Sequence, residues 1–224
     1  MPVRVYKMDS RKKKKFSTGF SINTNLILIN IVAYVVFYSL IASGIFTWAH
    51  VAIKPSNIFQ GKYIWTFITS MFMHGSFAHL FVNMFSLFFV GNLLQKILGS
   101  KRYLYFYLLA GLFAGLVFVL GGLIYSEDFN AYAVGASGAL FGLIGLLVLL
   151  TPNLPVYLMF IPIPIKIKYA GPGMLVVLWI ISKLAGIPIG NTAHFGGLIA
   201  GLAYGFYLKN RYKNKVRLIS RHFS

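Results

Sequence analysis

Long apolar segments constrain what this chain can fold into. A helix needs about 20 apolar residues to cross the hydrocarbon core of a bilayer. Six segments approach or reach that length: residues 22–47, 77–98, 102–125, 136–151, 165–185 and 192–209. No long polar stretch remains that could form a second, soluble domain. The sequence therefore predicts an all-α integral membrane protein, with a six-span domain over residues 22–209 between short basic tails at residues 1–21 and 210–224.

The charges are distributed unevenly along the chain. It has 21 Lys and Arg but only three acidic residues, Asp9, Glu127 and Asp128. Most basic residues lie in the two tails, in the second-to-third connection and in the fourth-to-fifth connection. Basic residues concentrate on the cytoplasmic side of membrane proteins. With six spans all of these segments share one side, so we expect a multi-pass protein of the cell membrane with both termini in the cytoplasm.

The basic residues also bear on the expected partners. A basic chain is compatible with nucleic-acid binding, but here the basic residues flank apolar spans, which favours a topological role. The RKKKK cluster at residues 11–15 is expected to contact anionic lipid headgroups. No small-residue cleavage site follows it, so residues 22–47 are interpreted as a span rather than a cleavable signal. Membrane lipid is therefore an expected partner and nucleic acid is not.

The fourth apolar segment is too short to cross a bilayer. A helix from Ser137 to Thr151 would be about 22 Å long, against a hydrocarbon core of about 30 Å. Thr151-Pro152 ends it on the cytoplasmic side, so Ser137 would lie near a submerged helix start. Non-helical backbone at that depth must be buried in protein or line a wet cavity. The AYAVGA segment before Ser137 thus predicts a water-filled cavity open to the non-cytoplasmic side.

Five polar residues are expected at one depth, near the outer ends of the second, fourth and sixth spans. They are His74, His79, Asn83, Ser137 and His194. Polar groups inside a membrane are energetically costly, and those that occur there usually belong to functional sites. These residues are the candidates for chemistry.

Ser137 allows two interpretations. Gly138 and Gly142 form a small-xxx-small face, which lets helices approach closely, so GASG by itself could serve packing. A catalytic role requires a base close to the hydroxyl.

His194 is the candidate base. Gly197, Gly201 and Gly205 follow it on the same helical face. Packing of that face against the fourth span would bring the imidazole to Ser137. A lone histidine in a span could instead bond a backbone carbonyl.

The HGSFAHLFVNM segment supplies the remaining candidates. His79 and Asn83 are four residues apart and share a helical face, where their N–H groups could stabilise an oxyanion together with the Ser137 amide. His74 is expected to brace a loop or a nearby backbone group. A zinc helix motif would need two His four apart with a Glu, and this pattern is absent, so neither a metal nor a cofactor is expected. No carboxylate completes a triad, and a Ser–His dyad is expected to suffice.

In these motifs the chain resembles the rhomboid intramembrane serine proteases. GASG with Ser137 matches the nucleophile motif, AHFGGLIAG with His194 matches the base motif, and HGSFAHLFVN matches the second-span motif. The resemblance covers nearly the whole chain and implies a six-helix bundle that cleaves transmembrane segments of other proteins near their outer ends. Gly197 and Gly201 occupy the glycine positions of the base motif.

The chain departs from the family pattern at three positions. Thr66 follows Trp65 where Arg is common, Gln95 stands where an acidic residue is frequent, and Phe141 stands where a Tyr packs against the base. None of these differences removes a catalytic group, and Phe141 keeps the supporting ring.

The predicted function is that of a serine endopeptidase acting on single-span or other transmembrane protein substrates. The alternative is a non-catalytic membrane chaperone or scaffold that binds transmembrane helices, and loss of Ser137 or His194 would have been its mark. A transporter would need a polar path across the whole bilayer, whereas the cytoplasmic halves of the spans are apolar.

The charge distribution generates a topological prediction. Reporter domains fused at Ser17 and at Phe223 should both be found on the cytoplasmic side, because an even number of spans returns the chain to the side where it starts. Protease protection of the two fusions in sealed vesicles measures this. Reporters on opposite sides would contradict the six-span topology.

Overall fold

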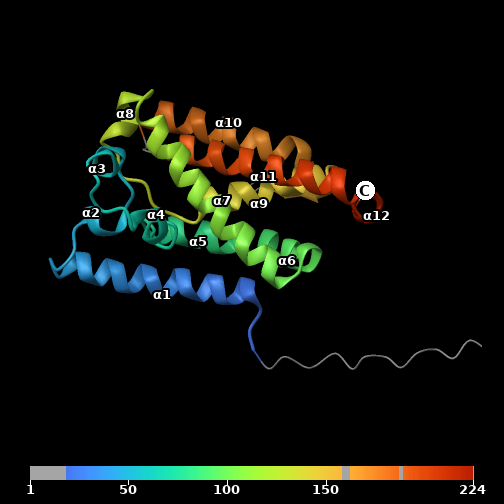
Figure 1. Cartoon of the computed structure of the whole chain (residues 1–224), viewed down its shortest axis with the longest axis horizontal. Coiled ribbons are helices and arrows are strands. Elements are labelled where there is room, and N and C mark those ends of the chain that lie inside the picture. The colour runs from blue at the N-terminus through green and yellow to red at the C-terminus, as the bar shows by residue number, and fades with distance from the viewer. Residues whose placement is uncertain (1–18, 158–161, 187–188, 224) are drawn as a thin grey trace, which may run out of the picture.

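The computed structural model describes residues 19–157, 162–186 and 189–223. The long helices are α1 (Ile22–Ala42), α7 (Ser100–Gly121), α10 (Ile167–Ala185) and α11 (Asn191–Arg211), and α5 (Phe77–Ser86) continues through a π-helix, η1 (Leu87–Gly91), into α6 (Asn92–Leu98). The shorter α9 (Ser137–Leu150) lies between α7 and α10 in the chain, and α12 (Lys213–His222) follows α11. The connection between α1 and α5 forms α2 (Trp48–Val51), α3 (Pro55–Phe59) and α4 (Thr66–Thr69), and the connection between α7 and α9 forms α8 (Ser126–Phe129). α9 contacts α7, α10 and α11, and in Figure 1 it is partly hidden behind them.

Helices occupy all six expected segments, with some different boundaries. α1 ends at Ala42 rather than near residue 47, because the chain turns at Gly44 with a positive φ of 76°. α10 begins at Ile167 rather than 165, because residues 165–166 form strand β2 (Ile165–Lys166), which pairs antiparallel with β1 (Pro155–Val156). The sequence did not predict this small hairpin. By length and composition, four of the described helices can cross a membrane: α1, α5–α6, α7 and α10.

The segment expected as a C-terminal tail is mostly helical. α11 extends through Arg211, two residues beyond the expected domain end, and α12 follows after Tyr212. Val216 of α12 is buried and belongs to the main hydrophobic core. The basic residues of α12 lie on one side of the helix and leave an apolar side, which includes Val216, to pack against the bundle. Of the N-terminal tail, residues 1–18, including the RKKKK cluster, lie outside the described residues.

α9 is the buried centre of the bundle. Nearly all of its residues are shielded, and it contacts α5, α7, α10 and α11. A helix that is apolar on all sides is stable only when neighbours surround it, and the Leu, Ile and Val run of α9 fits that position. The helix ends at Leu150, and the Thr151 hydroxyl donates to the Leu147 carbonyl.

Glycines allow α9 and α11 to pack backbone against backbone. A Cβ at Gly197 would collide with the Gly138 carbonyl oxygen, and a Cβ at Gly201 would collide with the Gly142 carbonyl oxygen. On the α9 side, a Cβ at Gly145 would lie 2.5 Å from the Leu198 carbonyl oxygen. Small residues allow such approaches in membrane bundles, so the two helices can pack this closely only while these positions lack side chains.

The other glycines of α9 face a different neighbour. A Cβ at Gly138 would lie 2.8 Å from the Ala114 Cβ, and one at Gly142 would lie 2.6 Å from the Ala110 Cβ. Both alanines belong to α7. The face formed by Gly138 and Gly142 was expected to meet the sixth span, α11, but its missing side chains make room mainly for the third span, α7. The α9 glycine whose Cβ position faces α11 is Gly145.

A buried polar network attaches α1 to the bundle. The side-chain Nδ2 of Asn23 donates to the carbonyl of Leu87, the first residue of η1, at 3.0 Å. The Tyr103 hydroxyl donates to Asn23 Oδ1 at 2.5 Å, and the Asn23 backbone N–H donates to Gln95 Oε1 at 2.7 Å. Gln95, one of the departures from the family pattern, thus still links α1 to α6 through a neutral amide.

The connection between α1 and α5 is stabilised at Thr66, a second position where the chain departs from the family pattern. Trp65 Nε1 donates to the His50 carbonyl at 3.0 Å, and the Thr66 hydroxyl donates to the Tyr63 carbonyl at 2.6 Å. Thr66 is fully buried, so it stabilises the turn from inside where an arginine would not fit without rearrangement.

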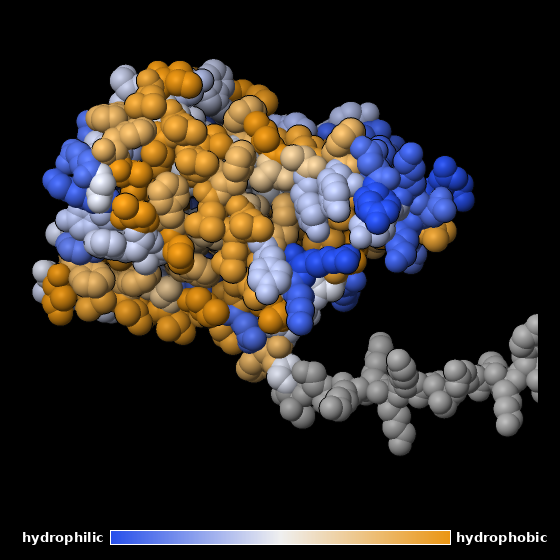
Figure 2. All heavy atoms as spheres, in the orientation of Figure 1, coloured by the Kyte–Doolittle hydropathy of each residue, from blue (hydrophilic) through white to orange (hydrophobic). Residues whose placement is uncertain are grey.

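The outer surface of the bundle is apolar. Many Leu, Ile, Val and Phe side chains of α1, α5, α7 and α10 are exposed, and in Figure 2 hydrophobic residues cover most of the visible face, while hydrophilic residues gather at its ends. A soluble protein rarely exposes so large an apolar area. This surface belongs to a multi-pass membrane protein.

The glycine packing generates a stability prediction. Gly201→Ala should lower the free energy of unfolding by about 1–3 kcal/mol, because its methyl group meets the backbone of α9. Gly173→Ala in α10 is the matched control, since a Cβ there meets nothing within 4 Å; it should leave stability unchanged or slightly raised. Thermal unfolding in one detergent measures both. Equal melting temperatures for the two variants would contradict this packing.

Candidate active site

A non-helical segment before α9 reaches the centre of the bundle. Ala133 pairs with Ile53 in an isolated antiparallel bridge, with N–H···O distances of 3.1 and 2.9 Å. The Gly135 N–H donates to the Ser70 carbonyl at 2.8 Å, and Gly135 has a φ of 124°, which favours glycine. These contacts pair backbone polar groups of the segment within the protein, and α9 begins two residues later.

Ser137 and His194 lie in direct contact. His194 Nε2 is 2.8 Å from Ser137 Oγ, although the residues are 57 positions apart in sequence. Ser137 is the first residue of α9, and His194 lies in the first turn of α11 with only 7% of its surface exposed. The glycine contacts described above, one to two turns further along both helices, bring the two side chains together.

An aromatic ring covers the imidazole. Phe141 stacks on His194 with ring centroids 4.6 Å apart and planes inclined by 23°. The Nδ1 atom of His194 is buried and has no hydrogen-bond partner among the described residues. Among the described residues no carboxylate orients the histidine, and the ring packing of Phe141 restrains it instead.

The second-span residues line the same place. A Cβ at Gly135 would lie 2.9 Å from His79 Nε2 and 3.6 Å from Ser137 Oγ, so His79 and Ser137 flank Gly135 closely. The Asn83 side-chain N–H donates to the His79 carbonyl at 2.8 Å. An amide nitrogen carries two hydrogens, so Asn83 keeps a second donor beyond this helical bond.

His74 lies beneath this group. It is fully buried, its ring packs edge-on against His79 at 5.1 Å, and its Nε2 accepts from the Ala136 N–H at 3.4 Å. This contact holds the backbone just before Ser137.

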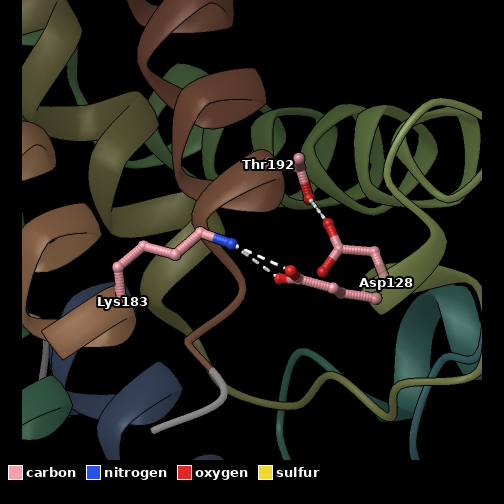
Figure 3. Close-up of polar contacts among 4 residues, drawn as sticks. Asp128, Lys183 and Thr192 are labelled. Carbon is pink, nitrogen blue, oxygen red and sulfur yellow. Dashed lines mark hydrogen bonds and ion pairs between the residues drawn. The ribbon is translucent and has the colours of Figure 1, made fainter. Parts of the chain in front are cut away.

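Polar contacts at the outer rim were not predicted from the sequence. Figure 3 shows Lys183 donating to the Glu127 carboxylate at 2.8 and 3.0 Å, and the Thr192 hydroxyl donating to Asp128 Oδ2 at 2.9 Å. Partial burial raises the pKa of the Asp128 carboxyl above its ordinary value. The sequence placed Glu127 and Asp128 in a loop, but it did not reveal their partners, which lie 56 and 64 residues further along the chain.

These rim contacts join α8 to the ends of α10 and α11. Thr192 is two residues before His194, so the Asp128 contact fixes the first turn of the helix that carries the imidazole. Exposed ion pairs contribute little to stability, and the Lys183–Glu127 pair is mostly exposed, so the less exposed Thr192–Asp128 contact has the larger structural effect.

Within the described ranges, no group of three or more His, Cys, Asp and Glu side chains is placed to hold an ion. The three histidines of this site face a serine and amide donors instead.

A partly buried Ser–His contact at the start of a short helix lies inside a helical bundle whose exposed surface is apolar, as in multi-pass membrane proteins. Comparison with known proteins assigns the family: the Rhomboid domain profile matches residues 61–211. The chain belongs to the rhomboid family.

Individual relatives agree with this assignment. The chain is 35% identical over 147 residues to RHOMBOID-like protein 5 of Arabidopsis thaliana, covering 64% of this chain and 44% of the relative. It is 34% identical over 153 residues to Rhomboid protease GluP of Bacillus subtilis, covering 66% and 26%. It is 28% identical over 156 residues to Rhomboid protease GlpG of Yersinia pseudotuberculosis, covering 68% and 51%. The match spans about half or less of each relative's length.

The loop geometry generates a prediction. Gly135→Ala should cost about 1–3 kcal/mol in stability because of its positive φ, and its methyl group should displace His79. Labelling of Ser137 by a fluorophosphonate probe should slow accordingly. Gly75→Ala is the control in the same region, because the nearest atom to its Cβ is 3.9 Å away. Labelling of both variants at the wild-type rate would show that Gly135 does not shape this site.

Proposed function

We propose that this protein is an intramembrane serine protease that cleaves transmembrane segments of other membrane proteins with a Ser137–His194 dyad. The observation that carries the proposal is the 2.8 Å contact between His194 Nε2 and Ser137 Oγ in a partly buried site. That distance lies within hydrogen-bond reach of a general base and its nucleophile. Family membership supports the same reaction class, since two of the relatives are named proteases.

The proposed reaction proceeds by covalent catalysis. Ser137 Oγ attacks the scissile carbonyl while His194 Nε2 takes the hydroxyl proton. The C–N bond then breaks, and His194 gives that proton to the leaving amine. Water, deprotonated by the same imidazole, hydrolyses the acyl-enzyme and restores the Ser137 hydroxyl. Phe141 keeps the ring oriented through both steps by stacking on it.

The negative charge on the carbonyl oxygen needs hydrogen-bond donors. The first N–H groups of a helix have no intrahelical acceptor, so the start of α9 supplies the Ser137 amide. His79 and the second hydrogen of Asn83 are the proposed side-chain donors, and His74 is the proposed brace for the backbone before Ser137. Removing one donor of such a set typically costs about 10²–10³ in rate.

The proposed membrane arrangement follows from the short α9. We propose that α9 and α11 complete a six-span bundle with both termini in the cytoplasm. The site would then open through a water-filled cavity to the other side. Hydrolysis requires water, and the polar residues near Ser137 support a wet site at that depth. Substrates would be single-span or other transmembrane proteins.

The non-catalytic alternative is a chaperone or scaffold that binds transmembrane helices. A scaffold gains nothing from a buried imidazole in contact with a serine hydroxyl, whereas a hydrolase requires both. The presence of the pair favours the protease.

Reconstitution tests the proposal. The full chain is incorporated into vesicles with a single-span reporter that carries small residues near its outer end. Ser137→Ala and His194→Ala should each lower the cleavage rate by at least roughly 10⁴-fold, with melting temperatures close to wild type. Ser43→Ala, an exposed hydroxyl beyond α1, should cleave normally. Cleavage by Ser137→Ala at a comparable rate would refute the mechanism.

A further inference from the structure

A groove of about 830 Å³ lies between α7 and α11, on the surface of the bundle. Its lining is almost entirely apolar and includes Leu109 and Leu116 of α7 and Ile199 of α11, all of them exposed. Ala200 and Ala203 line its α11 side, where small side chains leave the space open. None of the residues around the Ser137–His194 pair lines it, so this groove is separate from the candidate active site.

The groove is long enough for a lipid chain. From Arg102 to Leu116, both of which line it, α7 advances about 21 Å at 1.5 Å per residue. Half of the hydrocarbon core of a bilayer is about 15 Å. The groove therefore extends along the membrane by at least the depth of one leaflet.

A single cation marks one end of this apolar groove. Arg102 lines it and is exposed, close to the start of α7. The two acidic residues that the structure describes, Glu127 and Asp128, follow the opposite end of α7 and contact Lys183 and Thr192. No described carboxylate is thus available to Arg102, and its guanidinium is free to take an anion from outside the chain.

Tyr204 adds a neutral donor beside this cation. It lines the groove, and its ring stacks on Phe106 with centroids 4.9 Å apart. A phenol hydroxyl donates hydrogen bonds to phosphate oxygens as well as to carbonyls. Arg102 and Tyr204 together offer charge and a hydrogen-bond donor at one end of an apolar channel.

We propose that this groove binds an anionic phospholipid, with one acyl chain along α7 and α11 and the phosphate on Arg102. A transmembrane helix is a poorer occupant: it is about 10 Å across, and it gains no hydrophobic free energy by replacing lipid. It would also need an acidic residue at one matching depth to satisfy Arg102. A lipid headgroup carries its phosphate at that depth in every molecule.

Native mass spectrometry of the full chain in detergent tests the proposal. The protein is titrated with dioleoyl phosphatidylglycerol and with dioleoyl phosphatidylcholine, which share their acyl chains. Wild type should bind phosphatidylglycerol more tightly. Arg102→Gln should weaken phosphatidylglycerol about fivefold and phosphatidylcholine much less. Ala203→Leu should weaken both lipids roughly tenfold, because it fills the groove.

Matched controls separate the groove from the general surface. Lys101→Gln removes the neighbouring exposed charge, which does not line the groove, and Gly173→Leu adds a side chain on α10 where a Cβ meets nothing within 4 Å. Both should bind like wild type. Equal losses for Lys101→Gln and Arg102→Gln would show only a diffuse charge effect and overturn the proposal. So would a dimer that disappears in Ala203→Leu while lipid binding persists.

Discussion

The contact between the backbones of α9 and α11 is the constraint on which the rest of the structure depends. Lipid is as apolar as a leucine side chain, so these helices gain little from burying apolar surface and must associate through close packing. Gly145, Gly197 and Gly201 allow carbonyl oxygens of one helix to meet the Cα positions of the other. Ser137 is the first residue of α9 and His194 lies in the first turn of α11. The distance between the two helices therefore sets the distance between these two side chains.

The short length of α9 has an equally direct consequence. A helix that stops inside the bundle leaves backbone polar groups away from water, and each such group left unpaired costs roughly 1–3 kcal/mol. The Ala133 bridge to Ile53, the Gly135 contact with Ser70 and the Ala136 contact with His74 satisfy them. The same contacts hold the backbone before Ser137 in place. The hydrogen bonds that satisfy this non-helical segment therefore also position the proposed nucleophile.

The two ends of the bundle differ in their electrostatics. The described carboxylates lie at the rim of the candidate active site, where Glu127 and Asp128 tie α8 to α10 and α11. The start of α7 and the end of α11 are basic and have no described carboxylate nearby. Within the described part of the chain no carboxylate neutralises the cations at that end, which connects the charge pattern of the sequence to the proposed lipid groove.

The long apolar segments determined the helical class, and the length of the fourth segment predicted a short helix that begins near Ser137, because both depend on composition and length alone. Residue spacing also placed Gly197 and Gly201 on the face of His194. Only the tertiary structure decided that Gly138 and Gly142 face α7 while Gly145 faces α11, that Asn83 donates to the His79 carbonyl, and that Thr192 meets Asp128. Spacing fixes which residues share a face of one helix, but the rotation of that helix is set by packing against all its neighbours at once.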